Sequence, residues 1–150
     1  MNDVYMNKAL ELAEKGGLNV KPNPLVGAVI VKNNQIIGEG YHQEYGQAHA
    51  EINAFLNAKE DVTGATMYVT LEPCSHEGKT GSCAKKIIEK GIKEVFVATL
   101  DPNPLVAGKG IQMLKDAGIQ VHLGISQEQS NVMNQHFYHY ITQNKPFVLL

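Results

Sequence analysis

The sequence lacks the features that mark nucleic-acid-binding, membrane-spanning and secreted proteins. It contains no tryptophan and no arginine, and its formal net charge of −2 leaves no basic field to attract a phosphate polymer. No apolar run approaches the roughly 18 to 20 residues that cross a bilayer, and the first residues lead into an amphipathic pattern rather than a signal peptide. We therefore expect a cytoplasmic protein that binds neither nucleic acid nor membranes.

Cysteine is also scarce, since the chain has only two, which is too few for a disulfide framework. In a reducing compartment, paired cysteines more often bind a metal or take part in chemistry. The 150 residues are 43% hydrophobic and 19% charged, with no low-complexity run, which is typical of one globular domain with one core. The function must therefore be sought in the surroundings of the two cysteines.

Hydrophobic spacing, glycines and prolines predict ten elements in the order α-β-β-α-β-α-β-α-β-α. Helices are expected over 4–15, 49–58, 83–90, 109–117 and 127–144, and strands over 25–32, 35–41, 65–71, 94–100 and 119–123. Asn33-Asn34 predicts an antiparallel hairpin, whereas the later β-α-β units predict right-handed crossovers and parallel pairing. The predicted fold class is α/β: a three-layer α/β/α domain with a mixed five-stranded sheet and helices on both faces.

The last predicted helix has a recognisable start. Ser126 with Gln129 three residues later forms a capping-box pattern. Val132 is the first of several apolar positions along this helix that we expect to form a buried stripe.

Three side chains suited to zinc lie where two loops lead into two predicted helices. One imidazole and two thiolates, from His49, Cys74 and Cys83, make a set that binds tetrahedral zinc. Three protein ligands leave one position open, and a catalytic zinc uses that position for water, whereas a structural site is closed by a fourth ligand. The ligand count therefore favours a catalytic zinc, one per chain.

Glu51 lies two residues after His49, close enough to exchange protons at such a site. Each residue alone has a plainer interpretation: a lone cysteine is more often an inert buried thiol, and a histidine at a helix start is usually a surface or capping residue. Together, however, His-x-Glu followed by Pro-Cys and a second cysteine is the signature of the zinc deaminases. In that pattern Glu51 is the general acid and base.

The spacing of the cysteines departs from the usual deaminase pattern. Two residues normally separate them, whereas eight intervene here, from Ser75 to Ser82. Both thiols can still reach one ion if these residues bulge outward as a loop. That loop would then form a wall of the pocket.

These motifs extend over nearly the whole chain and resemble one family. The sequence is similar to the deaminase domain of the bacterial riboflavin-biosynthesis bifunctional deaminase/reductase, within the cytidine deaminase-like superfamily. The resemblance rests on Asn23-Pro24-Leu25-Val26-Gly27, Gly40-Tyr41-His42, His49-Ala50-Glu51, Thr70-Leu71-Glu72-Pro73-Cys74-Ser75-His76, Gly78-Lys79-Thr80, Cys83 and Asp101-Pro102-Asn103-Pro104. The long cysteine spacing separates this family from the cytidine and tRNA-adenosine deaminases. The chain departs from the family at Gly81-Ser82, where a pair of prolines is usual.

The resemblance implies a cytidine deaminase-like fold and a specific substrate, a small pyrimidine nucleotide. It is 2,5-diamino-6-ribosylamino-4(3H)-pyrimidinone 5′-phosphate, hydrolysed at ring position 2 to 5-amino-6-ribosylaminouracil 5′-phosphate and ammonia. The positions that match the family's contacts to base, ribose or phosphate are Asn23, His42, His76, Lys79 and Asn103. Each also has a structural interpretation, in which Asn23 and Asn103 stabilise turns, His42 caps a strand and Lys79 is a solvated loop residue.

Two other functions remain open from the sequence. One is a zinc deaminase acting on another nucleobase, nucleotide or tRNA adenosine, and the other is a zinc-stabilised binding module without catalysis. The resemblance also implies a homo-oligomer, a zinc-dependent deaminase domain over 1–145, and the beginning of a separate reductase domain over 146–150.

Overall fold

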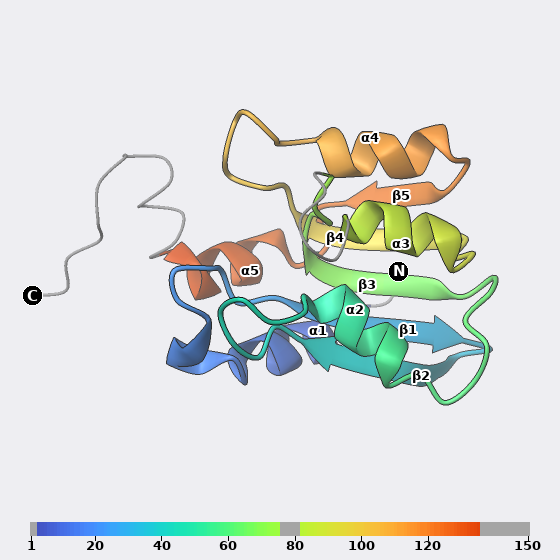
Figure 1. Ribbon diagram of the computed structural model, residues 1–150, viewed down its shortest axis with the longest axis horizontal. Coiled ribbons are helices and arrows are strands. Elements are labelled where there is room, and N and C mark those ends of the chain that lie inside the picture. Colours follow the sequence, from blue (N-terminus) through green and yellow to red (C-terminus); the bar gives the residue numbers. More distant parts are fainter. Residues whose placement is uncertain (1–2, 76–81, 136–150) are drawn as a thin grey trace, which may run out of the picture.

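The computed structural model describes residues 3–75 and 82–135, and within them all ten predicted elements occur in the predicted order (Figure 1). The helices are α1 Asp3–Glu14, α2 Ala50–Leu56, α3 Cys83–Glu89, α4 Lys109–Asp116 and α5 Gln127–Met133. The strands are β1 Gly27–Lys32, β2 Gln35–Tyr41, β3 Thr66–Leu71, β4 Glu94–Thr99 and β5 Gln120–Leu123. A short 3₁₀ helix, η1 Gly17–Val20, was not predicted.

The five strands form one mixed sheet in the order β2-β1-β3-β4-β5. Strand β1 pairs antiparallel with both β2 and β3, whereas β3, β4 and β5 are parallel. Asn33 and Asn34 make the β1–β2 turn with φ angles of 53° and 61°, the left-handed conformation that a tight hairpin requires. The predicted hairpin, the parallel half and the mixed five-stranded sheet are confirmed.

Helices cover both faces of the sheet, which gives three layers (Figure 1). On one face, α2, α3 and α4 contribute buried residues such as Ala54, Ile87 and Leu114 to a core that also contains the alternate side chains Ala28 and Ile30 of β1. On the other face, α1 packs its buried Met6, Ala9 and Leu12 against Val29 and Val31, the remaining alternate positions of the same strand. Because successive strand residues point to opposite faces, β1 contributes to both cores.

Two glycines allow the helices near the cysteines to approach the backbone closely. A Cβ on Gly40 of β2 would lie 2.3 Å from the backbone nitrogen of Ala54 in α2, and a Cβ on Gly110 of α4 would lie 1.9 Å from the carbonyl oxygen of Pro73. Neither distance is possible for a real Cβ atom, so any other residue would push the helix outward. The α2 helix therefore packs directly on β2, and the segment before Cys74 packs directly on α4.

The predictions for the last helix are partly wrong. Ser126 precedes α5 in a left-handed conformation, with φ at 59°, and its side chain makes no capping hydrogen bond, so the capping box is absent. Val132 is 64% exposed, whereas Ser130 and Asn134 are buried, so the helix docks through polar side chains at these positions. Positions 136–144 of the predicted helix lie outside the described residues. In the part of the chain that the structure describes, no helix has the length and apolar character to span a membrane.

Candidate metal and active site

The first part of the site is the N-terminal end of α2. His49 has an extended backbone and occupies the N-cap position, and Glu51 follows in the first helical turn. Glu51 is 3% exposed, which is unusual for a carboxyl group at a helix start. The helix thus brings an imidazole and a buried carboxyl group to the same end of the sheet.

The second part joins the end of β3 to the start of α3. Cys74 lies three residues after β3, and Cys83 is the first residue of α3. The backbone N–H of Cys83 donates to the Sγ of Cys74 at 3.2 Å, and that of Ala84 donates to the Cys74 carbonyl at 3.0 Å. Two N–H groups at the start of α3 therefore bind Cys74, although eight residues separate the two cysteines.

The side chains of His49, Cys74 and Cys83 converge, and their ligand atoms all lie within 4.8 Å of one another. The Nδ1 of His49 is 3.3 Å from the Sγ of Cys83 and 3.9 Å from that of Cys74. Ligand atoms around a tetrahedral zinc lie about 3.5 to 3.8 Å apart, given a Zn–S bond of about 2.3 Å and a Zn–N bond of about 2.0 Å. The three side chains therefore fit a zinc ion with little movement.

The ionisation of Cys74 also favours metal binding. The thiol of Cys83, together with its backbone N–H and the imidazole of His49, lowers the pKa of Cys74 to about 4. Cys83 keeps the shared proton, because the hydrogen bond with Cys74 and burial raise its pKa. The lowered pKa favours the thiolate of Cys74. A metal ion would have to displace the proton of Cys83 and the proton that the raised pKa of His49 favours on its imidazole.

The pKa values of Glu51 and His49 are both raised, but for different reasons. Burial raises the pKa of Glu51 to about 7, an effect that His49 opposes. The hydrogen bond to Cys74 raises the pKa of His49, an effect that burial opposes. A carboxyl group whose pKa is near neutral can both accept and release a proton under physiological conditions.

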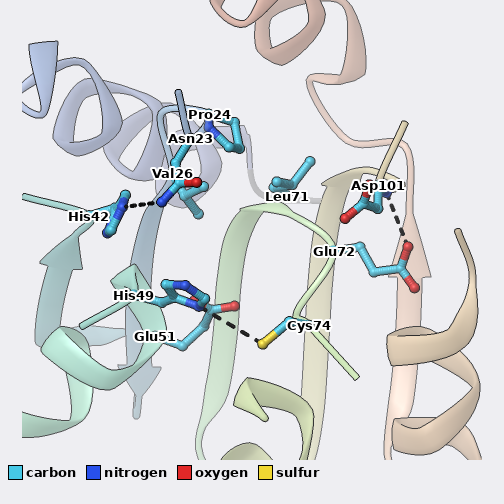
Figure 2. A pocket seen from close by; sticks show the side chains of 10 residues that line it. All are labelled: Asn23, Pro24, Val26, His42, His49, Glu51, Leu71, Glu72, Cys74 and Asp101. Atoms are coloured by element: carbon cyan, nitrogen blue, oxygen red, sulfur yellow. Dashed lines mark hydrogen bonds between the residues drawn. The ribbon is translucent and has the colours of Figure 1, made fainter. Parts of the chain in front are cut away.

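A cavity of about 230 Å³ opens directly above this group (Figure 2). Figure 2 shows His49 and Glu51 on one side of it and Cys74 across from them. The cavity is lined by Asn23, Pro24, Val26, His42, His49, Glu51, Leu71, Glu72, Cys74 and Asp101. A pocket with apolar walls and a few convergent polar groups suits a small heterocyclic ligand.

Two of the predicted substrate contacts, Asn23 and His42, meet in the pocket wall. The Nδ2 of Asn23 lies 3.1 Å from the Nε2 of His42, and the Nδ1 of His42 lies 3.2 Å from the Ala48 carbonyl. Because the carbonyl requires a proton on Nδ1, Nε2 accepts from the Asn23 amide, and the amide oxygen remains available. Burial lowers the pKa of His42, which favours this neutral form.

Glu72 is a pocket-lining residue to which the sequence assigned no role. Its buried carboxylate accepts three backbone N–H groups, from Asp101 at 3.1 Å, Gly108 at 2.9 Å and Ile111 at 3.1 Å. Two of these donors are at the N-terminal end of α4, so Glu72 caps that helix from β3's end. The sequence gives no signal for it, because its partners lie 29 to 39 residues away.

The other predicted substrate residues have different outcomes. Asn103 does not line the cavity, and its Oδ1 accepts from the N–H of Leu105 at 3.0 Å, which stabilises the turn. Asp101 stabilises the same turn, because its Oδ1 accepts from the N–H of Asn103 at 2.9 Å. His76 and Lys79 lie outside the described residues. Ser82, next to Cys83, caps α3 by accepting from the N–H of Lys85 at 3.0 Å.

Residues 1–99 match the family described as the cytidine and deoxycytidylate deaminase zinc-binding region. The chain belongs to this family. Its metal is zinc, so the predicted cofactor is confirmed, and the group formed by His49, Cys74 and Cys83 is the place in the described chain where such an ion fits.

Relatives within the deaminases confirm the resemblance seen in the sequence. The riboflavin biosynthesis protein RibD of Bacillus amyloliquefaciens is 53% identical over 150 residues, which are 100% of this chain and 40% of that protein. A diaminohydroxyphosphoribosylamino-pyrimidine deaminase of Buchnera aphidicola subsp. Schizaphis graminum is 48% identical over 89% of this chain and 91% of its own length. This chain thus spans a minor part of one relative and almost all of the other.

A solved structure of RibD from Acinetobacter baumannii has the same deaminase fold. It superposes with a TM-score of 0.93 at 50% identity and covers 97% of this chain and 41% of that one. The predicted cytidine deaminase-like fold is therefore confirmed.

Proposed function

We propose that this chain hydrolyses 2,5-diamino-6-ribosylamino-4(3H)-pyrimidinone 5′-phosphate to 5-amino-6-ribosylaminouracil 5′-phosphate and ammonia. The observation that carries the proposal is the position of a buried carboxyl group, Glu51, beside three zinc-type ligands at the base of a pocket. The names of the relatives, which belong to riboflavin biosynthesis and to this deamination, support the choice of substrate.

In this proposal, His49, Cys74 and Cys83 hold the metal. Bound zinc supplies an activated water as the nucleophile. The new carbon–oxygen bond forms at ring position 2, and the bond to the exocyclic amine breaks. Glu51 would take one proton from the water and pass it to the adjacent ring nitrogen. It would then take the second proton from the hydroxyl now on ring position 2 and give it to the departing amine, so that a carbonyl forms, ammonia leaves and no other reactant is consumed.

The wall of the pocket opposite Cys74 would orient the base. Asn23, with its amide nitrogen engaged by His42, presents its oxygen as an acceptor for N–H groups of the pyrimidinone. His42 then acts through Asn23, since both of its ring nitrogens already have partners. We assign His76, Lys79 and Asn103 to the ribose and phosphate, in keeping with the family resemblance, and Lys79 supplies the positive charge that a phosphate requires.

A panel of substrates tests the proposal. The zinc-loaded protein is incubated with the pyrimidinone nucleotide, cytidine, deoxycytidylate and adenosine, and ammonia release is measured for each. We expect turnover of the pyrimidinone nucleotide and none above background for the others. Preferential turnover of another base would replace this substrate, and zinc binding without any turnover would favour the non-catalytic zinc module.

We also propose that the chain assembles with copies of itself in the cytoplasm. The large exposed apolar side chains of Leu18, Leu56 and Leu105 offer surfaces for association, and two free cysteines suit a reducing compartment. Sedimentation analysis tests the assembly, and a single monomeric species at every concentration would contradict it.

We further propose that 1–145 are the deaminase domain and that 146–150 begin a reductase domain.

A further inference from the structure

Asn134, at the end of α5, binds the backbone of a residue that is 109 positions away in the sequence. Its Oδ1 accepts from the N–H of Leu25 at 2.7 Å, and its Nδ2 donates to the carbonyl of the same residue at 2.9 Å. The side chain is only 4% exposed. It thus satisfies both backbone groups of Leu25, as a neighbouring β-strand would do.

Leu25 lies in the pocket wall that precedes β1. Its neighbours Pro24 and Val26 line the cavity, as does Asn23. The antiparallel pairing with β3 begins only at Ala28, so the sheet does not hold Leu25 from that side. The N–H of Asn23 donates to the Val20 carbonyl at 2.8 Å, and the Val26 carbonyl accepts from the N–H of His42 at 3.0 Å. Between them Pro24 has no N–H, so the hydrogen bonds of Asn134 are what fixes the backbone at Leu25.

Ser130 lies one turn earlier on α5 and has a different target. Its Oγ donates to the carbonyl of Thr70 in β3 at 3.0 Å, and the residue is fully buried. The hydroxyl of Thr99 donates to the same carbonyl at 3.2 Å. Ser130 therefore attaches α5 to the sheet, whereas Asn134 attaches it to the pocket wall.

We propose that Asn134 is a positioning residue for substrate binding. By fixing the backbone of Leu25, it sets the place of Asn23 and of the apolar surfaces of Pro24 and Val26 against which the base would lie. This inference rests on the proposed function, because it assumes that a substrate base occupies this cavity. It assigns to α5 a role in the pocket, although no α5 residue lines it.

The test compares Asn134→Ala with Ser130→Ala, which removes a buried polar side chain from the same helix face but spares the pocket wall. We expect Asn134→Ala to raise KM for the pyrimidinone nucleotide about tenfold, with kcat nearly unchanged and zinc content equal to wild type, because ground-state binding is lost. Ser130→Ala should leave KM unchanged while lowering the melting temperature. An unchanged KM in Asn134→Ala, or an equal rise in Ser130→Ala, would overturn the proposal.

Amide hydrogen exchange measures the attachment without relying on turnover. In the wild-type protein the Leu25 amide should exchange slowly, and in Asn134→Ala it should exchange markedly faster, while the Gly27 amide, bonded to Thr70 at 3.2 Å, stays protected. A rapidly exchanging Leu25 amide in the wild type would overturn the attachment even if Asn134→Ala failed to fold. Absence of wild-type turnover would instead count against the proposed function.

Discussion

At the scale of single residues, burial gives Glu51 its chemical character. A carboxyl group that is 3% exposed and has a pKa of about 7 differs from an ordinary surface glutamate, although both occur at helix starts. Desolvation disfavours the charged form and so brings the two protonation states close in energy. This property suits a residue that must accept a proton and then release it within one catalytic cycle.

Replacing Glu51 with glutamine tests this role. The amide has nearly the same shape but cannot carry a proton between water and amine, so we expect kcat to fall by about 10² to 10⁴. Zinc content and the circular dichroism spectrum should match the wild type, because none of the three ligands changes. Glu60→Gln, on the exposed surface after the same helix, is the control and should turn over normally. A normal rate for Glu51→Gln would show that the acid/base assignment is wrong.

The local sequence was enough to predict the group of possible zinc ligands, but not the residues that hold the surrounding loops in place. His49 and Glu51 share one helix start, and Cys83 begins another, so short motifs correctly predicted that the three possible metal ligands come together. The roles of Glu72 and Asn134 depend on partners 29 to 109 residues away, and no local pattern reports such pairs. The sequence likewise did not reveal that His42 binds Asn23, because that contact depends on the loops' folded positions.

At the scale of secondary-structure elements, the site depends on how helix ends meet the sheet. Periodicity and glycine positions predicted every helix and strand within the described residues to within about two residues at most boundaries. The capping of α5 was predicted wrongly because Ser126 adopts a left-handed backbone after Gly124, which the capping-box pattern does not take into account. Strand β1 starts at Gly27 rather than Leu25, and the backbone groups of Leu25 bond to the side chain of Asn134 instead of to a neighbouring strand.

Glu72→Gln tests the attachment of α4 to the end of β3. The amide cannot accept all three N–H groups, so at least one buried donor loses its partner, and we expect the free energy of unfolding to fall by about 1 to 3 kcal/mol. Denaturant unfolding measures this change. Glu128→Gln, in the first turn of α5 and exposed, removes a carboxylate from another helix start and should change stability by less than about 0.5 kcal/mol. Equal effects would contradict the capping role.

At the scale of the whole molecule, the hydrophobic cores and the metal site contribute separately to the stability of the protein. The two cores on either side of the sheet contain most of the large buried side chains, and neither core includes His49, Cys74 or Cys83. A domain of 150 residues with such cores is large enough to stay folded without a metal staple. A zinc ion would therefore add stability by binding the native state, but it would not create the fold.

Zinc removal and return, followed by turnover of the pyrimidinone nucleotide, test the central claim most directly. The chelated protein should keep its circular dichroism spectrum, melt at a lower temperature and release no ammonia. Addition of one zinc ion per chain should restore both the melting temperature and the rate. Full turnover by the zinc-free protein, or no turnover after zinc is restored to a folded chain, would contradict the account of this protein as a zinc-dependent deaminase.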